Sequence, residues 1–208
     1  MNSEIPVILR AFEKKNTDHE DKNLPLELNL SENKAICEKV LQELKKVGLN
    51  NFKMILREKS SAVKLYFKYT KEKYNIEFLD SPVNGDLNNI KLACNNINNS
   101  FLVMDSLSIP QLDIDKLYEI HKNDHNILTL VCKIEIVEIP FESVEIDNGN
   151  ICLMENNPRF TFFKNTGIFM AEPEILDFVS MDKPTSIWDI IKIFANNNKK
   201  VGTFVIYE

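Results

Sequence analysis

The stretch FLVMDSLSIPQLDIDKLYEIHKND, residues 101–124, decides the predicted fold. Its first five residues are an apolar run that ends in an acid, which predicts a buried strand with Asp105 at its end. Apolar residues with helical spacing follow at 113–123, and Asp113 occupies the N-cap position of that helix. A strand followed by a helix is the unit from which parallel sheets are built. The carboxylate at the strand end also raises the question whether Asp105 binds a metal ion.

The same alternation of strand and helix precedes this stretch. The helix predicted at 31–48 has the clearest pattern, with Ser31 as its N-cap and Gly48 as its C-cap. This order predicts parallel strands joined by crossover helices. In this half we expect strands at 5–12, 52–56 and 74–80, and helices at 31–48, 60–72 and 86–98.

The second half of the sequence favours antiparallel pairing. A long β-branched run predicts a strand at 127–139. This nearly continuous apolar strand could lie at a sheet edge and pair with another chain. Between 143 and 155, Asn148-Gly149 separates two strand patterns, which predicts a hairpin with a type I′ turn. Further strands are expected at 159–171 and 200–208, with short helices between them. The predicted fold class is therefore α/β: a Rossmann-like mixed β-sheet with central parallel strands flanked by helices and an antiparallel hairpin in the second half.

Composition and charge exclude several classes of protein. A chain of 208 residues with 44% hydrophobic content can form one sizeable core, so we expect a single domain. The net charge of −6 comes without the basic stripe that phosphate backbones require, which argues against nucleic acid as a partner. No apolar run reaches 18 residues, and the first residues lack the pattern of a secretion signal. We therefore expect no membrane partner and a cytoplasmic location.

Cysteine and histidine spacing does not favour a metal site. His121 and His125 have zinc-ligand spacing, but no third ligand follows at a characteristic distance. We interpret them as helix-end histidines, because cations suit a helix C-terminus. The cysteines are widely separated in apolar surroundings without a CxxC pair, so we expect reduced, buried thiols. They are Cys37, Cys94, Cys132 and Cys152.

The order of residues along the chain resembles that of the sugar-phosphate nucleotidyltransferases of the glucose-1-phosphate thymidylyltransferase and mannose-1-phosphate guanylyltransferase type. These enzymes make nucleotide sugars from an NTP and a sugar 1-phosphate. The resemblance covers about residues 5–207 and implies the fold of the nucleotide-diphospho-sugar transferases. It also implies a single domain over 1–208, with a nucleotide-binding half at 1–110 and a sugar-binding half at 111–208. Four segments carry it: LPLELNLSENKAICEKVLQELKKVGLNNF (24–52), residues 101–124, IPFESVEIDNGNI (139–151) and MENNPRFTFFKNTGIFMAEPEILDFV (154–179).

The resemblance implies a glycine-rich loop after the first strand, where backbone N–H groups approach the triphosphate. Here the segment ILRAFEKKNTDHEDK (8–22) contains no glycine. Arg10 could supply positive charge without that cradle, and Lys22 falls roughly where the family has its loop lysine. The turn that admits the base reads SPVNGDLNN (81–89) in an altered order. We therefore expect that base recognition is lost and that the chain is a degenerate member of this type, with Lys22 as a candidate catalytic contact or an ordinary surface lysine.

In the family, the strand that corresponds to 101–105 ends in Gly-Asp, and that aspartate holds Mg²⁺. An alignment without a gap puts Ser106 at the glycine and Leu107 at the aspartate, so Asp105 lies two residues early. Two strand residues span roughly 6 to 7 Å, too far for a metal bond of about 2.1 Å unless the loop is rebuilt. The second metal aspartate of the family lies beyond the last strand. We expect no bound metal and interpret Asp105 as an acid that caps a loop, with Mg²⁺ as the cofactor only if the protein is active.

The sugar-binding half keeps part of the family pattern. Glu142 stands where the family has a hairpin glycine, and a carboxylate there would face an anionic phosphate. Asn156 stands where the family has a lysine. The candidate substrate-binding residues that survive are Glu155, Asn165 and Gly167, although Gly167 also suits tight strand packing.

Three functions follow as hypotheses, and the sequence leaves open whether the chain is an enzyme. The first is a catalytically inactive nucleotidyltransferase-like protein that serves as a regulatory or interaction subunit, with a protein partner or an active paralogue. The second is a divergent, active sugar-1-phosphate nucleotidylyltransferase that uses Lys22, Asp105 and Glu155 in displaced roles. The third is a module that binds a sugar phosphate around Glu155, Asn165 and Gly167.

Overall fold

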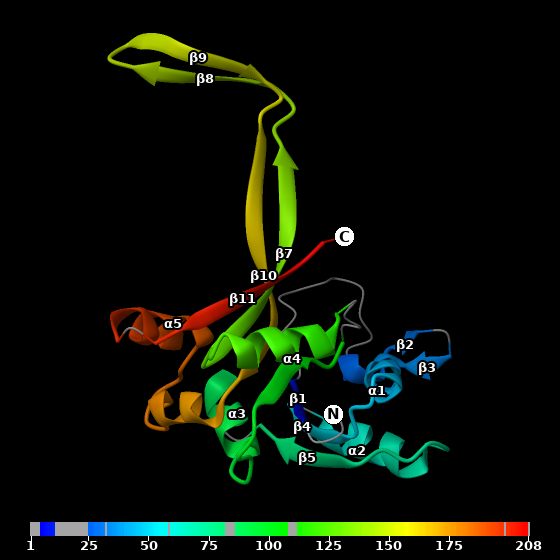
Figure 1. The fold of residues 1–208 in the computed structure, drawn as a ribbon. Coiled ribbons are helices and arrows are strands. Elements are labelled where there is room, and N and C mark those ends of the chain that lie inside the picture. Colours follow the sequence, from blue (N-terminus) through cyan, green and yellow to red (C-terminus); the bar gives the residue numbers. More distant parts are fainter. Residues whose placement is uncertain are drawn as a thin grey trace.

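The computed structural model describes residues 5–10, 25–31, 33–57, 59–81, 86–107, 112–197 and 199–207. Its centre is a seven-stranded sheet in the order β11-β7-β10-β6-β1-β4-β5 (Figure 1). The strands of this sheet are β1 (Pro6–Arg10), β4 (Asn51–Leu56), β5 (Ile76–Asp80), β6 (Phe101–Asp105), β7 (Leu128–Glu138), β10 (Arg159–Ala171) and β11 (Val201–Ile206). Two small sheets join β2 (Leu30–Ser31) to β3 (Lys34–Ala35), and β8 (Glu142–Asp147) to β9 (Asn150–Asn156). The predicted mixed α/β sheet is confirmed.

Four neighbouring strands are parallel, as the βα units predict. β1 pairs in parallel with both β4 and β6, and β4 pairs in parallel with β5. The chain moves outward from β1 to β4 and β5, then returns to β6 on the other side of β1. The strand order therefore reverses between β1 and β6, where Arg10 and Asp105 lie opposite each other in the register.

The strand predicted at 127–139 does not lie at the edge of the main sheet. Over Leu128–Lys133, β7 pairs with β11 on one side, and β10 pairs with it on the other. The edge strands are β11 and β5. The edge expectation was wrong for this part of β7, because an apolar run looks the same whether one or two strands flank it.

Helices cover both faces of the sheet. Successive residues of β6 alternate between two cores: Leu102 and Met104 belong to one, and Phe101 and Val103 belong to the other. The first core packs against α1 (Ile36–Lys46), α2 (Ser60–Tyr69) and α4 (Ile114–Asn123). The second packs against α3 (Asp86–Ala93), η3 (Pro173–Phe178) and α5 (Ile187–Asn196). β1 and β6, at the centre of the sheet, are buried on both faces, which explains their nearly continuous apolar sequences, whereas the edge strand β5 is only partly buried.

The start of α1 differs from the prediction, and its end agrees with it. Ser31 belongs to β2 and not to a helix cap, because the short β2–β3 hairpin uses the residues before Ile36. At the other end Gly48 has φ 87°, a left-handed conformation that glycine adopts at little cost. Gly48 N donates to Lys45 O at 3.0 Å, and Leu49 N donates to Leu44 O at 3.1 Å. These two bonds form a Schellman motif, so glycine ends the helix as expected.

The predicted Asn148-Gly149 hairpin is confirmed and lies at the end of a long projection. Asn148 has φ 47° and Gly149 has φ 80°, the pair of positive values that a type I′ turn requires. β7 and β10 continue past the main sheet as a two-stranded ribbon, and β8 and β9 form the hairpin at its far end (Figure 1). This projection places residues 142–156 far from the helical layers.

All four cysteines are free, as expected, and three of them are buried. The fourth, Cys152, is exposed on β9, so the expectation of burial was wrong there. Its apolar neighbours in sequence are themselves exposed in the structure, which the sequence pattern does not reveal. Within the described part of the chain, no helix has the length and apolar character needed to cross a membrane.

Candidate functional site

The candidate site lies at the carboxyl ends of the parallel strands. In open α/β sheets, ligands bind outside these ends at the point where the strand order reverses, which here is between β1 and β6. Arg10 ends β1, Asp105 ends β6, and Arg57 directly follows β4. Asp86 begins α3, the helix that follows β5. Parallel strand ends therefore bring together charged residues that are far apart in the chain.

Arg10 spans the reversal point and is held by two contacts. Its Nη1 donates to Asp86 Oδ2 at 3.1 Å, and its Nη2 donates to the Gly167 carbonyl at 3.2 Å. The side chain is 20% exposed, and its Nε is buried without a hydrogen-bond partner among the described residues. The guanidinium therefore ties β1 to α3 and to β10.

Gly167 allows this close approach. It has φ 81°, and a Cβ atom there would lie 2.7 Å from Arg10 Nη2. No side chain fits at that distance unless the guanidinium moves. Asn165 stabilises the local backbone around Gly167, where the register of β10 is irregular, because its Oδ1 accepts from Gly167 N at 2.9 Å. The structure thus supplies a packing reason for a glycine at this position, and it brings Asn165 and Gly167 together.

Asp86 lies between two guanidinium groups. Besides the Arg10 contact, its Oδ1 lies 3.7 Å from Arg57 Nη2. Asp86 is in the first turn of α3, where the helix dipole also favours a negative charge. Sequence reasoning missed both residues, although Asp86 is the first residue of α3 and Arg57 directly follows β4, so both lie at the carboxyl edge of the sheet.

Asp105 caps the turn that follows β6. Its Oδ1 accepts from the Leu107 backbone N–H at 2.8 Å. Burial raises the pKa of Asp105, while the Leu107 hydrogen bond and the Arg10 charge act in the opposite direction. One carboxylate oxygen is therefore engaged with the backbone of the same turn.

A more deeply buried carboxyl, which the sequence did not reveal, interacts with the partly buried Asp105. Glu27 lies on η2 (Leu26–Leu28) and is only 6% exposed. Burial raises the pKa of Glu27, the Asp105 charge raises it further, and Arg57 opposes both effects. The segment around Glu27 alternates leucine with polar residues, and this pattern gives no sign that the acid is buried.

The described residues do not form a ligand set for a metal ion. Among them, no group of three His, Cys, Asp or Glu side chains is placed to hold one. Leu107, where the family resemblance would put the metal aspartate, has no oxygen donor in its side chain. Asp105 and Glu27 provide two carboxyls, of which Asp105 has one oxygen bonded to the backbone. No chemical step through Mg²⁺ follows from this arrangement.

The remaining sequence candidates lie elsewhere. Glu155 is on β9, in the hairpin at the far end of the projection, and is exposed. The six residues from Arg159 to Lys164 separate that end from Asn165, which corresponds to roughly 20 Å of strand. The structure therefore does not bring Glu155 together with Asn165 and Gly167. Glu142 is also exposed, on β8, and Lys22 falls outside the described residues.

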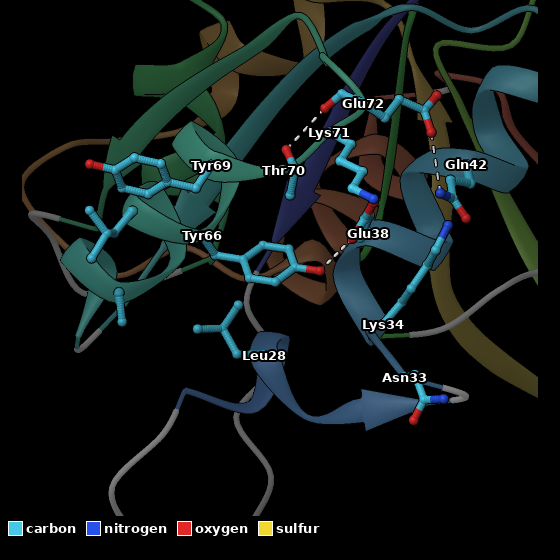
Figure 2. A pocket seen from close by; sticks show the side chains of 12 residues that line it. Leu28, Asn33, Lys34, Glu38, Gln42, Tyr66, Tyr69, Thr70, Lys71 and Glu72 are labelled. Carbon is cyan, nitrogen blue, oxygen red and sulfur yellow. Dashed lines mark hydrogen bonds between the residues drawn. The ribbon is translucent and has the colours of Figure 1, made fainter.

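A cavity of about 860 Å³ lies between α1 and α2, and none of the strand-end residues above lines it (Figure 2). Its buried acid, Glu38, accepts hydrogen bonds from Tyr66 Oη and from Tyr74 Oη, the latter at 3.3 Å. Burial, together with the Glu38 hydrogen bond, raises the pKa of Tyr66 to about 12. Two other polar groups of the lining, Gln42 Nε2 and Thr70 Oγ1, donate to Glu72 at 3.2 and 2.9 Å, so these groups form a structural network.

Several solved structures share this fold. HddC from Yersinia pseudotuberculosis matches with a TM-score of 0.72 and 16% identity, over 97% of this chain and 90% of that chain. The same protein complexed with GMP-PN matches with a TM-score of 0.68 and 17% identity over the same shares. A putative glucose-1-phosphate thymidylyltransferase from Bacillus anthracis, in complex with a sucrose, has a TM-score of 0.69 and 15% identity, over 97% and 86%. The inositol-1-phosphate CTP transferase from T. maritima has a TM-score of 0.67 and 11% identity, over 100% and 87%.

Neither a protein-family model nor a curated protein matches the sequence. The likeness therefore lies in three-dimensional structure at low sequence identity, and it extends over nearly the whole length of this chain. Likeness at this level reports fold and not activity. The chain has the fold of the sugar-phosphate nucleotidyltransferases.

Proposed function

We propose that this protein is a nucleotidyltransferase-like protein that does not transfer nucleotides and acts as a regulatory or interaction subunit. One observation carries the proposal: the Arg10 guanidinium crosses the reversal point of the sheet and is held by Asp86 and by the Gly167 carbonyl. Ligands of open α/β sheets bind at this edge, where an unpaired cation would be available to phosphate groups. Here it bonds to the protein's own groups.

Two further features support a loss of catalysis. The segment after β1 contains no glycine, so its backbone lacks the residue that best permits close approach to a triphosphate. Leu107 offers no ligand where the family resemblance puts the metal aspartate. Metal stabilisation supplies several kcal/mol to phosphoryl transfer, and roughly every 1.4 kcal/mol is a tenfold change in rate. Losing these contributions together would reduce turnover by many orders of magnitude.

A pyrophosphate-release assay tests the proposal. The full chain is incubated with Mg²⁺, each of the common NTPs and a panel of sugar 1-phosphates, beside an active glucose-1-phosphate thymidylyltransferase as the positive control. We expect no release above the rate without protein. Sustained release with any substrate pair would refute the proposal and establish the alternative of a divergent active enzyme. The Asp105→Asn variant would then show whether Asp105 takes part.

The regulatory role requires a second measurement. We expect that the turnover of an active nucleotidyltransferase from the same cell changes when this chain is added in equal amount. The matched control is the same enzyme with an unrelated protein of similar size and charge. Absence of both binding and any change in turnover, for every such enzyme of that cell, would contradict a role through an active paralogue.

A specific observation favours a second candidate, a module that binds a sugar phosphate. Two guanidinium groups, Arg10 and Arg57, converge on Asp86 at the strand ends, and Arg10 Nε is buried without a partner among the described residues. A phosphate could replace Asp86 between the two arginines, since guanidinium groups bind phosphate as well as carboxylate. Calorimetric titration with sugar 1-phosphates separates the candidates. Saturable binding without turnover, lost in Arg10→Gln, favours the binding module, and no binding favours the interaction subunit.

A further inference from the structure

The cavity between α1 and α2 is separate from the strand ends and has the size of a ligand pocket. Its volume of about 860 Å³ lies within the roughly 300–1,000 Å³ that is usual for pockets that hold small molecules. Twelve described residues line it, from η2, the β2–β3 hairpin, α1, α2 and the loop after α2 (Figure 2). The proposed function makes no use of this space.

One wall of the cavity is an apolar stripe along α2. Its four members follow the i, i+3, i+4, i+7 spacing of a single helix face. Another face of α2 enters the main core through Val63 and Phe67, so the stripe is a second apolar face of the same helix. Leu65 is 56% exposed and Tyr69 is 72% exposed, which leaves apolar area for a ligand to bury. The stripe consists of Ala62, Leu65, Tyr66 and Tyr69.

The acidic side chains of the cavity are bonded to other groups of the protein. Glu38 is only 6% exposed and accepts a hydrogen bond from Tyr66 Oη. Glu72 accepts from Lys45 Nζ at 2.7 Å and from Gln42 Nε2 at 3.2 Å, and the ion pair with Lys45 balances its charge. These bonds join α1 to α2 and to the loop after it, so both carboxylates contribute to the fold of the cavity.

The basic side chains of the cavity remain available. Among the described residues, neither Lys34 Nζ nor Lys71 Nζ has an ion pair or a hydrogen-bond partner, and both side chains are exposed. Figure 2 shows Lys34 extending along α1 and Lys71 extending from the loop after α2 toward α1. Because Lys45 balances Glu72, the lining presents two ammonium groups against one carboxylate, Glu38, which is buried. The charge left for a ligand is therefore positive.

We propose that this cavity binds a small organic anion in which an apolar body carries a carboxylate or phosphate group. The apolar body packs against the α2 stripe, and the anionic group binds Lys34 and Lys71. Ammonium groups bind carboxylate and phosphate alike as point charges, so the two anions share one recognition chemistry. This inference goes beyond the proposed function, since a ligand can occupy the cavity whether or not the strand ends are active.

The charge of the lining and its apolar wall select this class of ligand over three others. A cationic ligand would meet two unpaired ammonium groups, while the carboxylate that could attract it is buried and bonded to Tyr66. An inorganic anion would gain nothing from the α2 stripe, and a neutral apolar ligand would gain nothing from the two lysines. An anion with an apolar body is stabilised by both walls.

Amide NMR of the isotope-labelled full chain tests the proposal with matched probes at low ionic strength. Phenyl phosphate and phenylacetate carry a ring and an anionic group. Inorganic phosphate lacks the ring, benzyl alcohol lacks the charge, and benzylamine carries the opposite charge. We expect the two aromatic anions to shift amides within 33–42 and 62–72, with a Kd at least ~10-fold lower than that of each other probe. Comparison of the two aromatic anions then shows whether phosphate or carboxylate is preferred.

Paired variants with an equal change of charge locate the binding site. Lys34→Gln/Lys71→Gln removes the two cations of the cavity. Its matched control, Lys46→Gln/Lys116→Gln, removes two exposed cations that do not line the cavity. We expect the Kd of phenyl phosphate to rise at least ~5-fold in the first variant and to change less than ~2-fold in the control, because unscreened ammonium groups contribute most at low salt.

The wild-type titration alone can refute the proposal, so the test does not depend on the variants folding. Amides of Arg10 and Asp105 report binding at the strand ends and separate that site from the cavity. Shifts confined to those amides would overturn the proposal, as would equal affinity for inorganic phosphate or tighter binding of benzylamine. An equal rise in Kd in both variants, or no shift within 33–42 and 62–72 at ~10 mM phenyl phosphate, would do the same.

Discussion

Replacement of Gly167 by alanine should destabilise the protein through the Arg10 contact. A Cβ at this position would lie 2.7 Å from Arg10 Nη2, so the guanidinium must leave its place. Alanine at φ 81° costs roughly 1–2 kcal/mol of backbone strain. The lost hydrogen bond from Arg10 to the Gly167 carbonyl costs about 1 kcal/mol more. The ion pair with Asp86, whose side chain is 53% exposed, contributes less than ~1 kcal/mol after screening by solvent.

These contributions give a loss of about 3 kcal/mol in the free energy of unfolding for Gly167→Ala. For a chain of this length, that corresponds to a decrease of roughly 6–12 °C in Tm. Urea denaturation followed by circular dichroism measures the free energy, and calorimetry measures Tm. Gly149→Ala is a matched control, since Gly149 has φ 80° but its added Cβ would meet no atom within 4 Å. The control should show backbone strain without the clash.

A double-mutant cycle isolates the contact between Arg10 and Gly167. In the Arg10→Ala background the obstructing guanidinium is absent, so Gly167→Ala should cost only the strain, roughly 1–2 kcal/mol. The coupling between the two sites should therefore be at least ~1 kcal/mol. Equal costs in both backgrounds would show that Arg10 does not occupy the space beside Gly167, and the explanation of this glycine would be wrong. A cost below ~1 kcal/mol in wild type would have the same consequence.

Three further predictions concern other parts of the protein. Burial raises the pKa of Asp105, so its protonated form contributes stability that is present below the unfolded pKa and is lost as pH rises through the folded pKa. The variant Asp105→Asn keeps an acceptor for Leu107 N–H, so its stability relative to wild type should be greater at pH 8 than at pH 4. Urea midpoints of both proteins at the two pH values measure this, and a difference of opposite sign would contradict the prediction. Because three of the four cysteines are buried, a thiol-specific reagent followed by absorbance should modify only Cys152 in the folded protein and all four cysteines in guanidinium chloride. Rapid modification of a second thiol in the folded protein would contradict the burial. Ser186→Ala removes the capping box of α5 and should lower the free energy of unfolding by about 1 kcal/mol in urea titration, whereas no loss would show that the cap does not contribute.

Features that depend on residues adjacent in the sequence were predictable from the sequence alone. The strand at 159–171 has the predicted bounds, and α4 begins directly after its cap Asp113, whose side chain accepts from Lys116 N at 3.0 Å. The Asn148-Gly149 turn forms because both residues tolerate positive φ. The alternation of strand and helix was enough to predict a parallel sheet, since crossover helices require it. Asp105 at the end of its strand followed from the same local pattern.

Tertiary structure decided the contacts that define the candidate site. Arg10 meets Asp86 and Gly167 across 76 and 157 residues of chain, and only the strand order places them together. The burial of Glu27 likewise depends on elements that its own segment does not specify. Helix signals at 31–35 failed for a similar reason, because a short hairpin occupies those residues.

The projection that β7, β10 and the β8–β9 hairpin form beyond the main sheet shows the same division between local and tertiary information. An apolar, β-branched run at 127–139 determined that a strand forms, and β7 does form there. The run has nearly the same hydrophobic character over Leu128–Lys133, where β7 pairs with both β11 and β10, and beyond Lys133, where its described pairing is with β10 alone. The sequence therefore determined the strands and turns through propensities that act over a few residues. Only the packing of distant elements decided which apolar faces enter the core and which remain exposed, because burial depends on the neighbours that the whole fold provides.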